Sequence, residues 1–165
     1  MRLDKLTTKS QEAVQAAQEL AHQHSHQEVD GEHLAFVLSE QVDGIIPGLL
    51  QRAGIDLVGF KKDLGNELGR RARVQGVSSA DLYLGNDLRQ VLDAAQAEAT
   101  QLGDEFVSTE HLLLGMLSKG GAALKRVFDR HKLKRDALLN ALTDIRGNQR
   151  VTDINPEDKF QALEK

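Results

Sequence analysis

The chain has 165 residues, 40% of them hydrophobic, so it can bury the core of one compact domain. Its formal net charge of −4 argues against nucleic acid as a main partner, because phosphate binding needs a basic surface. It contains no cysteine, which excludes disulfides, thiolate catalysis and cysteine-based zinc sites. The sequence shows no secretory signal, and no apolar run reaches the ~20 residues that cross a bilayer, so we expect a cytoplasmic protein without membrane contact.

The first half of the chain has apolar residues at helical spacing. This pattern predicts a helix from Thr7–Thr8 to about His24. Pro47 is compatible with a helix only in its first turn, and Gly54 is a helix stop. Further helices are expected over about 31–40, 44–53 and 57–68.

The second half repeats this organisation after a linker, residues 69–85, that lacks helical periodicity and is expected to cross the surface. The predicted helices cover about 86–102, 108–118, 122–131 and 134–146. Gly103 and Gly147 are placed to stop helices. In the last stretch, Asn155 and Pro156 are typical of an N-cap and a first helical residue.

The two halves match each other without a gap at an offset of 78 residues. The pair Glu32–His33 recurs as Glu110–His111, and 110 − 32 gives the offset. Over positions 8–64 against 86–142, eleven of 57 aligned pairs are identical. A single gapless offset over this length indicates an internal duplication.

The repeated phrase is explained first as a helix start. Asp30 and Ser108 are expected to cap the two helices. Glu32 and Glu110 then fall in the first turn, where a carboxylate stabilises the helix dipole by roughly 0.3–1 kcal/mol. Apolar residues flanking each cap can form a hydrophobic staple: Val29 with Leu34, and Val107 with Leu112.

Catalytic and metal-binding patterns are weak. His33 and His111 have no second ligand four residues on. His22, His24 and His26 lie at a helix end, where partly charged histidines are favoured without any metal. The phosphate-binding loop of ATPases is absent from the chain, and the basic stretch over 69–73 fits a solvated linker. We therefore predict no catalytic residues, no metal and no cofactor in this chain, with a metal-dependent hydrolase as the weaker alternative.

The sequence resembles a known family. "STEHLLLGML" (108–117), preceded by "AQAEATQLGDEFV", is similar to the repeat signature of the Clp N-terminal domain, and "AQELAHQHSHQEVDGEHLAFVL" (17–38) is a looser copy. The opening "MRLDKLTTKSQEAV" and the final "NPEDKFQALEK" are similar to the ClpB-type disaggregase branch of that family. The resemblance implies an all-α fold in which two pseudo-twofold four-helix repeats form one eight-helix domain.

The resemblance also implies boundaries. The domain would cover residues 1–147, with one repeat over about 7–68, the linker over about 69–85 and the second repeat over about 86–147. Residues 148–165 would begin the linker to an AAA+ ATPase module that this chain lacks. ATP and Mg²⁺ would bind only that module of a full-length, hexameric stress-response protein, and this fragment would be a monomer that neither binds nor hydrolyses ATP.

The implied function is the capture of unfolded or aggregated polypeptides for threading by the ATPase, together with a DnaK-type chaperone system. The substrate-binding surface of the family falls on Thr7, Asp104 and Glu110 here, with an apolar groove that includes Val14 and Leu92. We expect Asp104 to be a surface acid and Glu110 a helix-start charge, and removal of either to cost about 1 kcal/mol or less. Val14 and Leu92 also lie on apolar stripes and fit a core role.

A second interpretation keeps the binding role and changes the ligand. Glu32 and Glu110 are equivalent in the two repeats and could hold guanidinium groups, as in an adaptor-docking or phosphoarginine-binding module of the ClpC type. The end of the chain favours the ClpB branch over this alternative.

Overall fold

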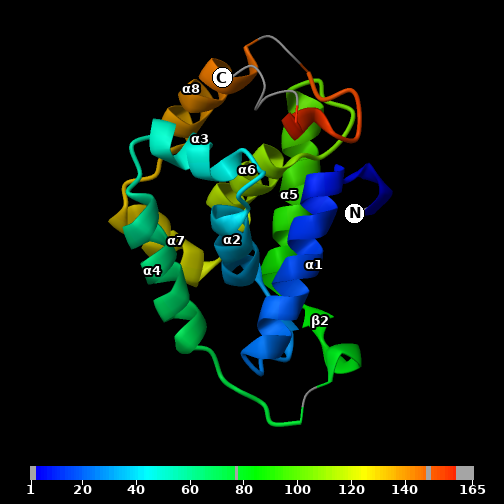
Figure 1. Cartoon of the computed structure of the whole chain (residues 1–165), viewed down its shortest axis with the longest axis vertical. Helices are drawn as coiled ribbons and strands as arrows, with labels where there is room; N and C mark the ends of the chain where they lie inside the picture. Colours follow the sequence, from blue (N-terminus) through cyan, green and yellow to red (C-terminus); the bar gives the residue numbers. More distant parts are fainter. Residues whose placement is uncertain (1–2, 77, 148–149, 159–165) are drawn as a thin grey trace.

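A computed structural model describes residues 3–76, 78–147 and 150–158 of the chain (Figure 1). Eight α-helices lie within these residues: α1 Thr8–Gln23, α2 Gly31–Glu40, α3 Ile46–Arg52, α4 Leu57–Gly69, α5 Asn86–Gln101, α6 Thr109–Lys119, α7 Ala122–Arg130 and α8 Arg135–Arg146. The short elements are two 3-10 turns, η1 Leu3–Lys5 and η2 Ser79–Asp81, and two strands, β1 Glu28–Val29 and β2 Tyr83–Leu84. The predicted helices and the all-α class are confirmed, with bounds that differ by a few residues.

The two halves interlock through a pseudo-twofold relation. Helix α1 packs on α2 as α5 packs on α6, and α2 contacts α6 near the centre of the molecule (Figure 1). Helix α3 packs against α8, and its counterpart α7 packs against α4. The third and fourth helices of each repeat therefore rest on the other repeat, so both repeats share one core.

Short parallel pairings join the halves in the same symmetric way. Leu6 pairs with Val107, and 78 residues on from Leu6 its counterpart Leu84 pairs with Val29. The segment before each first helix thus lies beside the segment before the second helix of the other repeat. The linker over 69–85 was expected to be irregular. It contains β2 because this pairing supplies hydrogen bonds that helical periodicity does not reveal, and it contains η2, which begins with a capping box between Ser78 and Asp81.

Helix ends also recur at equivalent positions. Gly103 and Gly54, two predicted helix stops, have φ of 76° and 87°. Their counterparts at the 78-residue offset are Ser25 and Lys132, with φ of 59° and 56°. A left-handed residue after the helix lets the chain turn back, and the backbone adopts it in both repeats although only one repeat has glycine there.

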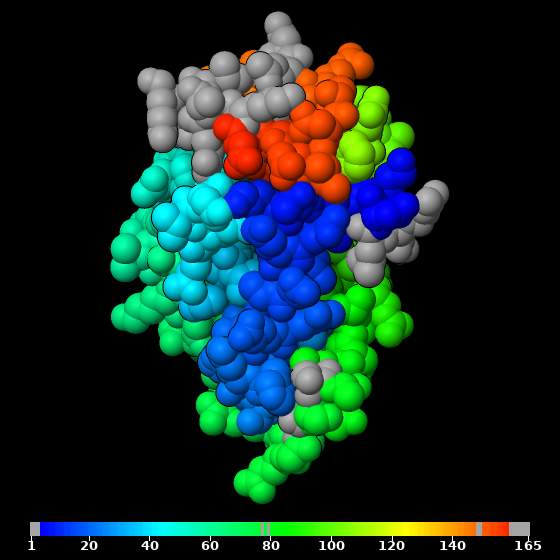
Figure 2. Space-filling model, turned by 45° about the vertical axis from the view of Figure 1, so that its right-hand side comes forward, coloured from blue at the N-terminus to red at the C-terminus, as the bar shows by residue number. Residues whose placement is uncertain are grey.

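Residues 150–158, called the tail segment below, pack back onto the body. Figure 2 shows the tail segment, in orange to red, lying over the beginning of α1 in dark blue. Val151 and Glu157 are fully buried, and residues 156–158 are helical, as the Asn155–Pro156 pattern predicted. The predicted boundary at residue 147 stays a prediction. No helix among the described residues is long and apolar enough to span a bilayer.

Candidate functional site

The histidine of the duplicated Glu-His pair helps to cap the beginning of the second helix in each repeat. The backbone N–H of Asp30 donates to Nδ1 of His33 at 2.9 Å, and that of Ser108 donates to Nδ1 of His111 at 2.8 Å. These imidazoles take the place of the glutamate in a capping box. Because Nδ1 accepts, each neutral imidazole carries its proton on Nε2 and can donate from it. Sequence reasoning missed this role; the recurrence of His three residues after each cap was the available signal.

Each Nε2–H donates to a residue at the same repeat position, but the two acceptors differ in charge. His33 Nε2 is 2.8 Å from Nδ1 of His26, whereas His111 Nε2 is 2.7 Å from Oδ2 of Asp104. Burial, followed by the positive charge of Arg71, lowers the pKa of His33 to about 3 and that of His26 to about 4. The first repeat therefore holds a neutral pair where the second holds an anion.

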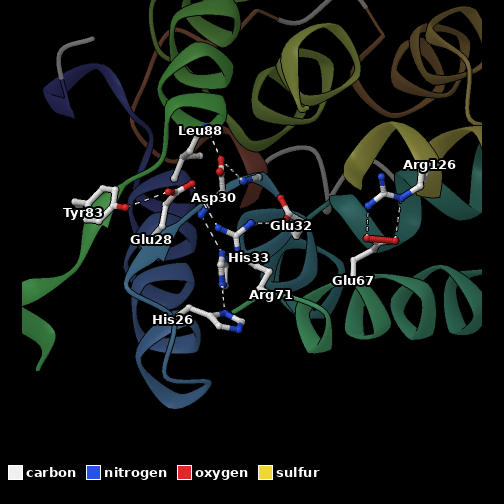
Figure 3. Close-up of polar contacts among 11 residues, drawn as sticks. His26, Glu28, Asp30, Glu32, His33, Glu67, Arg71, Tyr83, Leu88 and Arg126 are labelled. Carbon is white, nitrogen blue, oxygen red and sulfur yellow. Dashed lines mark hydrogen bonds and ion pairs between the residues drawn. The ribbon is translucent and has the colours of Figure 1, made fainter. Parts of the chain in front are cut away.

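The first repeat adds a carboxylate–arginine cluster that fixes the linker (Figure 3). Arg71 Nη1 donates to Glu32 Oε2 at 2.6 Å, and Arg71 Nη2 lies 3.4 Å from Glu28 Oε1. Tyr83 Oη donates to Glu28 Oε2 at 3.2 Å. Glu32 thus already holds a guanidinium, and that guanidinium belongs to the chain itself.

Asp30 caps two helices at once. Its Oδ1 accepts from the backbone N–H of Gly31 in α2 at 3.0 Å and of Leu88 in α5 at 2.7 Å. Burial, and then its hydrogen bond with Glu28, raises the pKa of Asp30 to about 7. Gly85 lies close beside it, and a Cβ there would lie 2.5 Å from Asp30 Oδ2, so a larger residue would have to displace that carboxyl group.

The second repeat builds its cluster around Asp104. Its Oδ1 accepts from Arg146 Nη2 at 2.7 Å and from the backbone N–H of Val151 at 2.8 Å. Burial opposes ionisation, but the hydrogen bonds from His111 and Arg146 outweigh it and lower the pKa of Asp104 to about 2. Arg146 Nη1 also lies 3.5 Å from Glu110 Oε2, so one arginine serves both acids.

A buried carboxyl group from the tail segment lies at the beginnings of α1 and α6. Glu157 Oε1 accepts from Thr7 Oγ1 at 2.8 Å and from the backbone N–H of Thr109 at 3.3 Å. Burial, and then the charge of Glu110, raises the pKa of Glu157 to about 7. Glu110, the neighbouring acid, accepts at Oε1 from Ser108 Oγ.

The structure brings Thr7, Asp104 and Glu110 together, as the resemblance implied, but it buries them. Thr7 and Glu110 have no exposed surface, and Asp104 is 8% exposed. The prediction that Asp104 is a surface acid is wrong, because the tail segment and Arg146 cover and pair it. Glu110 lies in the first turn of α6, as predicted, but it is buried there. Sequence reasoning missed Arg146 and Glu157, since their partners lie 42 and 150 residues away.

The two residues predicted for an apolar groove lie in the shared core. Val14 in α1 is 9% exposed and Leu92 in α5 is 4% exposed. An apolar ligand could reach them only if neighbouring residues moved. Their role in binding stays a prediction.

The alternative guanidinium site is occupied in both repeats by arginines of this chain. Arg71 contacts Glu32, and Arg146 contacts Glu110. An external guanidinium would have to displace them. Within the described ranges, no three His, Asp or Glu side chains are grouped so that they could hold a metal ion.

Comparison with known proteins agrees with this architecture. The Clp repeat (R) N-terminal domain family matches residues 5–131. The chaperone protein ClpB of Nitratidesulfovibrio vulgaris is 42% identical over 168 residues, and that of Bacillus anthracis is 40% identical over 167 residues. Each alignment covers 100% of this chain and 19% of the relative, so the chain spans about a fifth of their length.

The fold is also similar to solved structures. The Hsp104 N-terminal domain of Candida albicans superposes with a TM-score of 0.81 at 20% identity, covering 93% of this chain and 99% of that domain. The N-terminal domain of the ClpV1 ATPase from Escherichia coli gives a TM-score of 0.63 at 24% identity, covering 98% and 84%. With the family match over most of its length, the duplicated helix starts and the interlocked repeats, the chain belongs to the Clp repeat (R) N-terminal domain family.

Proposed function

We propose that this chain is the non-catalytic substrate-binding module of a ClpB-type disaggregase chaperone. The observation that carries the proposal is the alignment of the whole chain with ClpB chaperones at 40–42% identity. The module would capture unfolded or aggregated polypeptides in the cytoplasm. A hexameric AAA+ ATPase, absent from these 165 residues, would bind ATP and Mg²⁺ and act with a DnaK-type system.

Capture would take place where α1 and α6 begin, at the cluster of Thr7, Asp104 and Glu110. Extended polypeptide carries backbone groups that suit this place, since the tail segment already bonds there through its own carbonyl and N–H groups. Apolar residues of a client would add roughly 25 cal/mol per Å² buried, most of it offset by association entropy. Binding of a single copy should therefore be micromolar or weaker, and six copies would strengthen it by avidity.

A titration of isotope-labelled chain with reduced, carboxymethylated α-lactalbumin, which stays unfolded, tests the proposal. We expect saturable chemical-shift changes centred on Thr7, Asp104 and Glu110, and native α-lactalbumin as control should cause none. Absence of binding, or changes confined to the helix end that carries His22 and His24, would contradict the proposal.

The ClpC-type alternative is not favoured by the observed pairing. Glu32 and Glu110 both face arginines of this chain, and each replacement by an external guanidinium would exchange one ion pair for another. We also expect the fragment to be a monomer and its linker to the ATPase module to begin near residue 148. Sedimentation at micromolar concentration measures the first expectation.

A further inference from the structure

We propose that the tail segment is a built-in, displaceable ligand of the surface formed by the beginnings of α1 and α6, so that it competes with clients for that surface. This inference rests on the proposed function, because it concerns the regulation of the same binding surface. It concerns residues 150–158, which the family profile does not cover, since that match ends at residue 131.

The first support is that the tail segment makes the contacts that an extended peptide ligand would make. Val151 donates its N–H to Asp104 and accepts at its carbonyl from the N–H of Glu105 at 2.7 Å. Three residues on, the carbonyl of Ile154 accepts from the N–H of Thr8, the first residue of α1, at 2.9 Å. These bonds are made to backbone or to acid groups, so another polypeptide could make them in place of the tail segment.

The second support is the pair of buried anchors. Val151 has no exposed surface, and six residues later Glu157 reaches Thr7 and the N–H of Thr109, the first residue of α6. A carboxyl group accepts favourably at a helix N-terminus. Between these anchors, Thr152 and Ile154 are exposed, as expected for a segment lying on a surface.

The third support is that one anchor is poorly satisfied in its place. Glu157 Oε2 is buried without a hydrogen-bond partner, and Glu157 and Glu110 repel each other when both are charged. A buried carboxyl group in this condition costs free energy, which weakens docking of the segment that carries it. The tail segment is thus held by specific contacts, and the unpaired Glu157 Oε2 weakens that hold.

The tail segment bonds two of the three residues that the binding proposal depends on, and it places Glu157 near the third. Asp104 bonds Val151, Thr7 bonds Glu157, and the charge of Glu110 acts on Glu157. A client can reach them only after the segment leaves. The apparent dissociation constant of the client is then the intrinsic constant divided by the fraction of molecules whose tail segment is released. If the docked form is ten times more populated than the released form, client binding is weakened about tenfold.

The primary test uses the unaltered chain. Amide hydrogen exchange of Val151, read by NMR, is measured as reduced, carboxymethylated α-lactalbumin is added. Client binding should remove the protection of the Val151 amide in proportion to occupancy, while protection of the Leu34 amide in α2 is unchanged. Binding with full retention of Val151 protection would overturn the competition and leave the proposed function standing.

Variants give the second arm. Val151→Asp and, independently, Glu157→Ala should release the tail segment and tighten client binding, by about tenfold if docking is favoured ten to one. The controls are Thr152→Asp, the same change at the adjacent exposed position, and Glu157→Gln, which keeps the acceptor for Thr7. Equal affinity of wild type and a folded released variant overturns this inference alone. Failure of both wild type and released variants to bind client removes the proposed function, and the inference with it.

Discussion

The most informative residue positions are those where the two repeats differ in charge but not in geometry. His26 and Asp104 sit at equivalent places, each accepting from the imidazole three residues past a helix cap. Only Asp104 also binds an arginine and a backbone N–H of the tail segment. Both copies share the helix start, and the acidic acceptor makes the second copy an attachment point of the tail segment.

Asp104→Ala should destabilise the fold by about 3–5 kcal/mol, because it removes one of the carboxylates that pair with Arg146 and leaves the donors of His111 and Val151 unmatched. Denaturant unfolding followed by circular dichroism measures this. Glu105→Ala removes an exposed acid of the neighbouring residue and should stay within about 0.5 kcal/mol. A loss near 1 kcal/mol for Asp104→Ala would instead support the surface location that the sequence alone suggested.

The carboxyl group of Glu157 should make docking of the tail segment depend on pH. Its pKa is raised from an ordinary 4.5 to about 7. Between these two pH values the docked state therefore binds more protons than the released state. The contribution to docking is therefore fully present below about pH 4.5 and is lost as pH rises through about 7. The groups facing Glu157 are Glu110, paired with Arg146, and the uncharged Thr7 and Thr109.

Exchange of the Val151 amide, corrected for its intrinsic pH dependence, should lose protection between about pH 5 and 8 as the Glu157 carboxyl ionises. Glu157→Gln removes the titrating proton and should flatten this profile. The pKa of Asp30 is also raised to about 7, and an Asp30→Asn variant measures how much of the pH profile comes from that group. An unchanged slope in Glu157→Gln would assign the effect to another group.

At the scale of helices, two glycines at helix ends, Gly54 and Gly69, allow the effect of backbone conformation to be isolated. Gly54 lies after α3 with φ of 87°, and a Cβ there would meet nothing within 4 Å. Gly69 closes α4 in an ordinary helical conformation, and a Cβ there would also meet nothing within 4 Å. The two glycines therefore differ in backbone conformation and share open surroundings.

Gly54→Ala should cost about 1 kcal/mol, because an L residue is strained in the left-handed region. Gly69→Ala should instead be neutral or stabilise by up to about 0.5–1 kcal/mol, since alanine has the higher helix propensity. Thermal or urea unfolding of both variants checks this. Equal effects of the same sign would show that conformation is not what Gly54 supplies.

For the whole molecule, local chemistry made much of the fold predictable. Caps such as Asp30, the stop at Gly54 and the gapless offset are short-range or periodic signals, and they located the helices. The site was less predictable, because its geometry depends on pairs such as Thr7 with Glu157, which are distant in sequence. Family resemblance located the acids Asp104 and Glu110, but only tertiary packing shows that they are buried beside Arg146 and the tail segment.

The same packing argues that neither repeat is a folding unit. Helix α3 rests on α8 and α4 on α7, so each repeat alone would expose apolar surface that the other now covers. We expect one cooperative unfolding transition, with equal calorimetric and van't Hoff enthalpies.

Leu34→Ala in α2 and its counterpart Leu112→Ala in α6 give the sharpest form of this expectation. Both leucines are fully buried, and each change should cost about 2–5 kcal/mol. If the repeats unfold together, either variant lowers the protection of core amides in both repeats by the same free energy, as native-state hydrogen exchange would show. Loss of protection confined to the mutated repeat would mean that the halves open separately and that the interlocked helices contribute little to their coupling.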